Sequence, residues 1–350
     1  MSKFWTDIVQ QLDPYVPGEQ PQDQQYIKLN TNENPYPPSP AVTKAINSYA
    51  VDDLRRYPDP ESRELRQALA VYTGLECEQI FVGNGSDEVL AHSFKTFFQG
   101  RDNILFPDIG YSFYPVYCSL YRVNYRTIAL DPGFTIDVSD YRLPNGGIII
   151  ANPNAPTGIT LTITAIRELL EFTDSVVVID EAYVDFGAES CQALINEYPN
   201  LLVVQTFSKS RSLAGLRLGY AMGHVELIEG LNRVKNSFNS YPVDRLASAA
   251  AIASLGDEEY FQQCKNKIIE SRNWLAGALR DLEFEVLDSN TNFLFARHSS
   301  CPAAQLYTEL KTAGILVRHF ETSRIENFIR ISIGTDDECL ALIETLKELL

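Results

Sequence analysis

Polar and charged residues follow several short apolar segments of this chain, in a pattern that suits chemistry on a phosphorylated ligand. Lys209 stands beside two hydroxyl residues, Thr206 and Ser208, and Arg217 follows a short distance along the chain. Arginine and hydroxyl groups are common partners of phosphate. This segment therefore predicts a phosphate site. The alternative is that Lys209 is simply a solvated lysine at the end of a strand.

A glycine-rich segment, GNGSDE (83–88), follows the apolar residues 80–82 and precedes a predicted helix. Glycine lets a backbone approach an anion closely, and the free N–H groups at a helix start bind phosphate. We therefore expect Gly85, Ser86 and Asp87 to extend the phosphate site. The alternative is a glycine-rich turn in which Ser86 only caps the helix.

A carboxylate, Asp180, directly follows the apolar segment 176–179, and Tyr183 comes shortly after it. A carboxylate at the end of a buried strand is costly unless it is paired, so Asp180 is expected to meet a cation in a cleft. A capping role or a metal site is the alternative. Asn154 lies in the segment NPNAPTG (152–158), whose prolines and glycine indicate a rigid turn.

The elements that must position these residues alternate between strand and helix. Continuous β-branched runs separated by helical segments predict a mostly parallel sheet that is buried on both faces. Ligands on such sheets bind at the carboxyl ends of the strands, which would bring the polar segments together. The expected strands are 80–82, 104–106, 123–129, 147–151, 176–179, 201–205 and 218–222, and the expected helices are 61–73, 86–98, 112–121 and 162–172.

The pattern changes near residue 241, which predicts a second domain. We expect an N-terminal arm (1–40), a large α/β domain (41–240) and a smaller C-terminal α/β domain (241–350). The expected helices of the small domain are 244–255, 258–282, 302–312 and 336–349, and its strands are 284–287, 291–295, 315–318 and 328–333.

The composition restricts the classes of function. A net charge of −17 argues against a nucleic-acid partner, which would need a basic face. No apolar run is long enough to span a membrane, and residues 1–25 lack the pattern of a signal peptide. The 6 cysteines and 4 histidines are scattered, which predicts neither disulfides nor a metal site. We therefore expect a cytoplasmic protein with no membrane partner.

Taken together and in this order, GNGSDE, NPNAPTG, DEAY (180–183) and SKSRSLAGLR (208–217) resemble the fold-type I aminotransferase family. The segments PYVPG (14–18), LNTNENP (29–35), RYPD (56–59) and FIRISIG (328–334) resemble its histidinol-phosphate aminotransferase branch. The resemblance implies a seven-stranded large domain, a smaller C-terminal domain and pyridoxal 5′-phosphate as cofactor. It also implies amino transfer between L-histidinol phosphate and 2-oxoglutarate, a step of histidine biosynthesis.

The resemblance further implies roles for individual residues. Lys209 would carry the cofactor as a Schiff base and later act as general acid and base. Asp180 would pair with the pyridine nitrogen, Tyr183 would donate to the ring hydroxyl and Tyr111 would stack on the ring. The remaining cofactor contacts would come from Arg217, Thr206, Ser208, Gly85, Ser86, Asp87 and Asn154, and from Tyr57 of the partner subunit in a homodimer with shared active sites.

The same resemblance places the substrates near the C-terminal arginines. Arg330 would bind both the glutamate carboxylate and the phosphate of histidinol phosphate. Arg318 and Tyr15 would help to hold the phosphate; alternatively, Arg318 is a surface strand residue and Tyr15 anchors the arm. Asn32 would line the entrance.

One position departs from the family pattern, because Ala155 replaces the asparagine that usually precedes Pro-Thr-Gly and bonds the ring hydroxyl. Asn152, Asn154 or a water could substitute, or Tyr183 could act alone.

Related enzymes on the same scaffold remain as alternatives, namely an aromatic-amino-acid aminotransferase and a threonine-phosphate decarboxylase. A regulator built on this scaffold would need a basic DNA-binding segment, which the chain lacks. A nucleotide-binding protein would need a GxGxxG or Walker motif, and neither is present.

Overall fold

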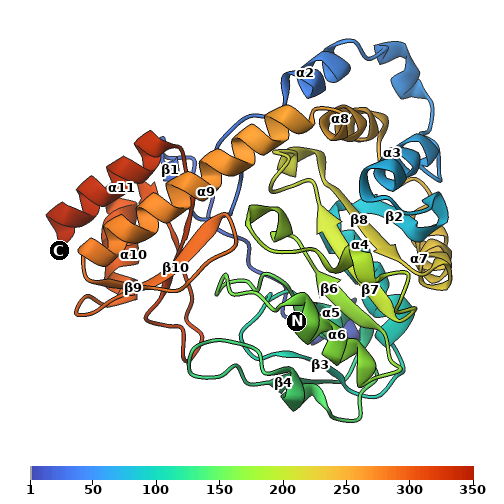
Figure 1. Cartoon of the computed structure of the whole chain (residues 1–350), viewed down its shortest axis with the longest axis horizontal. Helices are drawn as coiled ribbons and strands as arrows, with labels where there is room; N and C mark the ends of the chain where they lie inside the picture. Colours follow the sequence, from blue (N-terminus) through green and yellow to red (C-terminus); the bar gives the residue numbers. More distant parts are fainter. Residues whose placement is uncertain (1) are drawn as a thin grey trace.

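A seven-stranded sheet forms the centre of the larger of the two domains in the computed structural model, which describes residues 2–350 (Figure 1). The strand order is β2-β8-β7-β6-β5-β3-β4. Strand β8 is antiparallel to both of its neighbours, and the other neighbouring pairs are parallel. The prediction of a mostly parallel sheet is confirmed. The strands are β2 (Ile80–Asn84), β3 (Ile104–Pro107), β4 (Tyr125–Ile128), β5 (Ile148–Ala151), β6 (Val177–Asp180), β7 (Leu201–Thr206) and β8 (Leu218–Gly223).

Both faces of this sheet are covered by helices, which explains why its strands are apolar throughout. Ile148 and Ile150 of β5 pack into one buried cluster, and Ile149 between them packs into another on the opposite face. Successive side chains of a strand point to opposite faces, so a strand buried on both sides needs apolar residues without interruption. The helices of this domain are α2 (Pro40–Asn47), α3 (Arg63–Thr73), α4 (Gly85–Ser93), α5 (Tyr114–Tyr121), α6 (Ile163–Glu171) and α7 (Val225–Phe238). Helix α8 (Arg245–Leu255), which we expected in the small domain, packs against α2 and α3 of the large domain.

The smaller domain is built on a four-stranded antiparallel sheet in the order β12-β13-β10-β9. Its long helix α9 (Glu258–Asp281) runs from the neighbourhood of α8 across to the small sheet (Figure 1). Helix α11 (Asp336–Leu349) begins with a capping box formed by Thr335 and Glu338. The other elements are α10 (Ala303–Thr312), β9 (Phe284–Val286), β10 (Phe293–His298), β12 (Arg318–His319) and β13 (Ile329–Ser332).

The N-terminal arm joins the small domain, which its turn-rich sequence did not predict. After the short helix α1 (Asp7–Gln10), strand β1 (Ile27–Lys28) pairs in parallel with β11 (Ile315–Leu316). The Leu29 carbonyl then accepts a bond from Ser332 N at 2.9 Å. Beyond this point the arm segment, which we define as residues 29–34, passes toward the end of the large sheet. Within residues 2–350, no helix has the length and apolar character to cross a membrane.

Candidate active site

A cavity of about 420 Å³ lies at the carboxyl ends of β2, β6 and β7, where the large sheet meets the arm segment and β12–β13. Strand β8 runs in the opposite direction, so its first residues reach the same edge: Leu218 pairs with Asn84 and Gly219 with Thr206. The topology therefore brings Arg217 beside residues that follow β2 and β7. This is the edge at which ligands bind to open α/β sheets.

One end of the cavity is suited to a phosphate. Arg217 Nη2 lies 3.0 Å from Asp87 Oδ2, and its guanidinium covers Gly85 at the start of α4. A side chain at Gly85 would collide with that guanidinium, since an added Cβ would lie 2.6 Å from Nη2. The first N–H groups of a helix have no partner within it. This end thus combines a cation with free backbone donors, as anion sites do.

Two hydroxyl residues after β7 complete this end of the cavity. Thr206 Oγ1 donates to the Leu218 carbonyl at 3.2 Å and accepts from Ser208 N at 3.1 Å. Both side chains are buried. These bonds fix the turn that leads from β7 to Lys209.

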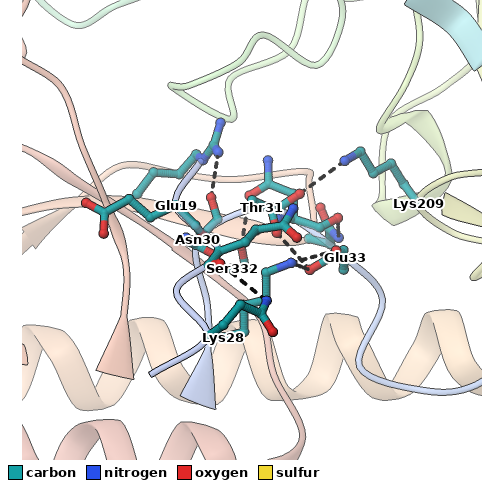
Figure 2. A network of polar contacts seen from close by, with 12 residues as sticks. Glu19, Lys28, Asn30, Thr31, Glu33, Lys209 and Ser332 are labelled. Carbon is teal, nitrogen blue, oxygen red and sulfur yellow. Dashed lines mark hydrogen bonds and ion pairs between the residues drawn. The ribbon is translucent and has the colours of Figure 1, made fainter. Parts of the chain in front are cut away.

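Lys209 reaches from this turn toward the arm segment, as Figure 2 shows. Its Nζ donates to the Thr31 carbonyl at 3.3 Å and lies 5.7 Å from the centre of the Tyr183 ring. The backbone of Lys209 is held as well, because Asn34 Nδ2 donates to the carbonyls of Lys209 (3.2 Å) and Ser210 (3.1 Å). The arm therefore fixes both ends of the lysine.

The carboxylate that ends β6 is the clearest electrostatic feature. Asp180 is 4% exposed, and no basic side chain among the described residues forms an ion pair with it. Its hydrogen bonds come from Tyr114 Oη (3.1 Å) and Ala182 N (3.2 Å). Burial raises the pKa of Asp180 to about 7, although these two bonds act to lower it. A buried carboxylate without a cation suits a ligand that brings one.

Two tyrosines, Tyr111 and Tyr183, also line the cavity. Tyr111 Oη donates to Asp87 Oδ1 at 2.9 Å. Burial raises the pKa of the Tyr111 phenol, and the charge of Asp87 raises it further. Tyr183 Oη accepts a bond from Asn32 Nδ2 at 2.9 Å.

Two arginines lie side by side on β12 and β13, where Arg318 and Arg330 are register partners. Arg330 donates through Nη2 to the Asn30 carbonyl at 3.1 Å, and its buried Nε has no partner in the described chain. Burial lowers the pKa of Arg330. Arg318 donates to the carbonyls of Pro17 (3.4 Å) and Val16 (3.3 Å). Tyr15 stacks on Phe113 with 4.7 Å between the ring centres.

The structure brings most of the sequence-predicted residues into this one cavity. Those that line it are Tyr15, Asn32, Ser86, Asp87, Tyr111, Asp180, Tyr183, Thr206, Ser208, Lys209, Arg217, Arg318 and Arg330. Gly85 lies behind Ser86 against Arg217. Tyr57 is 77% exposed and stacks on Tyr241 outside the cavity. A role for Tyr57 across a subunit boundary stays a prediction.

Asn154 is not among the residues that line the cavity, and a cofactor contact from this side chain stays a prediction. Its Nδ2 donates to the Ile109 carbonyl and to Thr157 Oγ1, both at 3.0 Å. Asn152 is likewise occupied, since it bonds the main chain of Leu161 in both directions. Ala155 does line the cavity. The donor groups of both amides are therefore engaged within the chain.

Sequence reasoning missed several residues of the site. Tyr114 holds Asp180, and the main chain of Asn30 and Thr31 accepts from Arg330 and Lys209. Tyr114 lies three residues after Tyr111, inside the expected helix 112–121, and it could have been found from this position. The carbonyl acceptors carry no signal in the sequence, because every residue has one.

Comparison with known proteins identifies the class of this chain. The family Aminotransferase class I and II matches residues 24–346, and the chain belongs to this family. Its relatives place it more narrowly in the histidinol-phosphate aminotransferase branch. Histidinol-phosphate aminotransferase 1 of Hydrogenovibrio crunogenus is 56% identical, with 99% of each chain covered. Histidinol-phosphate aminotransferase of Clostridium botulinum is 51% identical over 100% of this chain and 99% of its own.

A solved structure agrees with this placement. Histidinol-phosphate aminotransferase of Sinorhizobium meliloti, in complex with pyridoxal-5′-phosphate, matches with a TM-score of 0.90 and 25% identity over 100% of this chain and 99% of that chain.

Proposed function

We propose that this chain transfers the amino group of L-histidinol phosphate to 2-oxoglutarate, with pyridoxal 5′-phosphate bound at Lys209. One observation carries the proposal: a lysine amine, an unpaired buried carboxylate and an arginine at a helix start all face one cavity. The relatives at 51% and 56% identity carry the name of this activity. The names of these relatives do not include the amino acceptor, so 2-oxoglutarate is the more specific part of the proposal.

The residues present fit the proposed cofactor in charge. Arg217, Ser86 and Ser208 offer donors to its phosphate beside Thr206, and Asp180 offers a carboxylate to a protonated ring nitrogen. When bound, the cofactor draws electrons from the substrate carbon that carries the amine, so that its proton can be removed. Tyr111 flanks the space that a flat ring would fill.

Lys209 is the residue that we expect to bind covalently and then to move a proton. Its amine would hold the cofactor, and after release by the substrate amine it would take the proton from the amine-bearing carbon. The bond from Nζ to the Thr31 carbonyl offers the free amine a fixed place beside the cavity. Asp180, with no competing cation, keeps a positive ring nitrogen paired in a buried environment.

Arg330 and Arg318 are proposed to recognise the acidic groups of the substrates. Arg330 is half-buried, and its buried Nε has no partner among residues 2–350, so it can bind a carboxylate or a phosphate without breaking an ion pair. Arg318 is its neighbour across the β12–β13 pair and reaches the same cavity. Two cations also suit the phosphate of histidinol phosphate, which has no carboxylate.

We further propose a homodimer in which Tyr57 reaches the partner's phosphate end. Tyr57 and Val51 are 77% and 74% exposed, which leaves apolar surface here for a partner. Arg245 holds the Tyr57 carbonyl at 2.6 Å, so the segment is fixed although it is exposed. A mixture of Tyr57→Ala and Lys209→Ala chains should regain activity above either variant alone, because one mixed site has both parental residues.

Free cysteines support a reducing, cytoplasmic location as part of the same proposal. None of the cysteines among residues 2–350 forms a disulfide, and Cys118, Cys191, Cys264 and Cys339 are buried.

The spectrum of the purified protein tests the proposal. We expect a visible band that bleaches with glutamate, and an adduct trapped by borohydride that maps to Lys209. Lys209→Ala should lose both, while Lys347→Ala, an exposed lysine of α11, should keep both. A colourless parent that ignores added cofactor, or parental turnover by Lys209→Ala, would overturn the proposal.

Substrate profiling separates the alternatives on the same scaffold. The proposal predicts 2-oxoglutarate-dependent consumption of histidinol phosphate at a higher kcat/KM than for phenylalanine. Faster reaction of phenylalanine, or release of carbon dioxide from threonine phosphate, would favour one of the related enzymes instead.

A further inference from the structure

Asn32 of the arm segment is buried and held by hydrogen bonds, unlike a residue that only lines the entrance of a cavity. It is 1% exposed and has a φ of 56°, a left-handed conformation that asparagine tolerates better than most residues. Its backbone N–H donates to Ser332 Oγ at 2.8 Å, and its carbonyl accepts from Asn292 Nδ2 at 2.9 Å. Figure 2 shows Ser332 beside the arm segment. These two bonds hold the backbone of Asn32, and they thereby fix the position from which its amide side chain extends.

The bonds to Ser332 also decide which end of the Asn32 amide faces Tyr183. Ser332 Oγ accepts from Asn32 N, and its own proton needs an acceptor because Ser332 is only 2% exposed. Asn32 Oδ1, at 2.9 Å, is the acceptor that the described chain provides. The Nδ2 group must then face Tyr183 Oη, 2.9 Å away.

This arrangement fixes the role of the tyrosine hydroxyl. Tyr183 Oη accepts from Asn32, and no acceptor among residues 2–350 takes the proton of Tyr183 itself. Tyr183 lines the cavity. We propose that Asn32 and Ser332 are positioning residues that make Tyr183 a hydrogen-bond donor into the cavity.

The inference rests on the proposed function and goes one step further, because it concerns the direction of a hydrogen bond to the bound ligand. The side chain of Ala155 offers no donor to the cavity, and the amides of Asn152 and Asn154 are occupied elsewhere. None of these three side chains can therefore replace the Tyr183 donor if its direction is reversed.

An isosteric substitution reverses the direction without removing the tyrosine. In Asn32→Asp, the new carboxylate accepts from Ser332 and also from Tyr183, so the Tyr183 proton turns away from the cavity. The readout is the pH midpoint of the visible band of the cofactor-loaded protein. A donor facing the cavity favours the deprotonated form of the ligand it contacts. We therefore expect Tyr183→Phe and Asn32→Asp each to raise the midpoint by about one pH unit, the size of one hydrogen bond to a charged group.

The double variant separates this effect from the added charge alone. A charge acting through space would add to the effect of Tyr183→Phe, whereas a reversed hydrogen bond would not. We expect Asn32→Asp/Tyr183→Phe to have the midpoint of Asn32→Asp. Ser332→Ala, which adds no charge, should shift the midpoint in the same direction by a smaller amount, and it serves alone if Asn32→Asp does not fold.

Asn292→Asp is the matched control, since it also adds a carboxylate beside Asn32 but does not touch Tyr183. It should lower the melting temperature of the cofactor-free protein and leave the midpoint within about 0.3 pH units of the parent. Parental midpoints in both Asn32→Asp and Ser332→Ala would overturn the inference, as would additive shifts in the double variant. A protein without any visible band would instead contradict the proposed function.

Discussion

Arg324, in the segment between β12 and β13, donates to the Asp108 carboxylate at the end of β3, with 2.8 Å between Nη1 and Oδ2. Its Nη2 also donates to the carbonyls of Leu130 (2.9 Å) and Asp131 (3.0 Å). An apolar cluster that includes Ile109 and residues of the small domain lies beside this contact. The contact therefore ties the small domain to the strand end that leads to Tyr111.

Loss of the Arg324 contact should destabilise both the fold and the arrangement of the cavity. We expect Arg324→Ala to lower the free energy of unfolding by about 1–3 kcal/mol, because Asp108 and two carbonyls lose a donor. Arg233→Ala, which breaks an exposed pair with Glu229 in α7, should change it by about 0.5 kcal/mol or less. Urea unfolding of both variants checks this, and equal values would show that the domain tie adds nothing.

The buried carboxylate of Asp180 should make the cofactor-free protein less stable as the pH rises. Its pKa is about 7 in the fold against 3.8 in the reference state, so the folded chain binds the extra proton between these values. The contribution of Asp180 to the free energy of unfolding is therefore most favourable below about pH 4. This contribution is lost as the pH rises to 7.

Asp180→Asn should remove that loss. The variant should be more stable than the parent at pH 8 by a few kcal/mol, about the size of a buried unpaired charge, and equal to it near pH 4. Melting temperatures of the cofactor-free proteins between pH 4 and pH 8 give the comparison. Parallel curves for the two proteins would contradict the prediction.

The close contact between β8 and the start of α4 should not tolerate a side chain. A Cβ at Gly219 would lie 2.3 Å from Ser86 N and 2.6 Å from Gly85 C, both backbone atoms that cannot rotate away. Gly219→Ala should cost about 1–3 kcal/mol of stability and weaken the binding of the cofactor's phosphate. Gly277→Ala, in α9 with nothing within 4 Å, should instead stabilise by about 0.5–1 kcal/mol. Thermal melts and cofactor titrations of the two variants test this. Equal melting temperatures and equal cofactor affinities would contradict the prediction.

Substitutions of Arg318 and Arg330, the two arginines of the small sheet, should differ in which substrate's KM they raise. Arg330→Gln should raise KM for glutamate and for histidinol phosphate about 10- to 100-fold, the range of one lost charge-assisted interaction. Arg318→Gln should raise KM for histidinol phosphate and leave KM for glutamate within about threefold. Steady-state kinetics with each substrate varied test this. An equal effect of Arg318→Gln on both substrates would count against a separate phosphate role.

The sequence predicted the large sheet well because its strands are buried on both faces. The expected strand 201–205 is β7 (Leu201–Thr206), and the expected helix 258–282 is α9 (Glu258–Asp281). Helices α2 and α7 were missed. The prediction also started one helix at 112, whereas α5 begins at Tyr114. Proline is common in the first turn of a helix, and Pro115 stands there.

The site was predicted where side chains carry the chemistry and missed where the backbone does. Asp180 was predicted because a carboxylate is costly at the end of a buried strand, and Lys209 and Arg217 because the segment SKSRSLAGLR resembles the aminotransferase family. Asn32 was assigned only to the entrance, since its bonds to Ser332 join residues 300 positions apart. Local patterns hold no information on such pairings. Likewise, only the folded structure shows that no basic side chain among residues 2–350 forms an ion pair with Asp180.

The parallel pairing of β1 with β11 sets an order of assembly during synthesis. Ile27 and Lys28 leave the ribosome well before their partners Ile315 and Leu316, because the paired positions 27 and 315 are 288 residues apart. Contacts of such long sequence separation form late in folding. The Thr31 carbonyl that receives the Lys209 amine, the Asn32 amide that faces Tyr183 and the Asn34 amide that holds the Lys209 backbone follow directly after this late-docking strand. A nascent chain can thus complete its large sheet well before these three groups reach Lys209 and Tyr183.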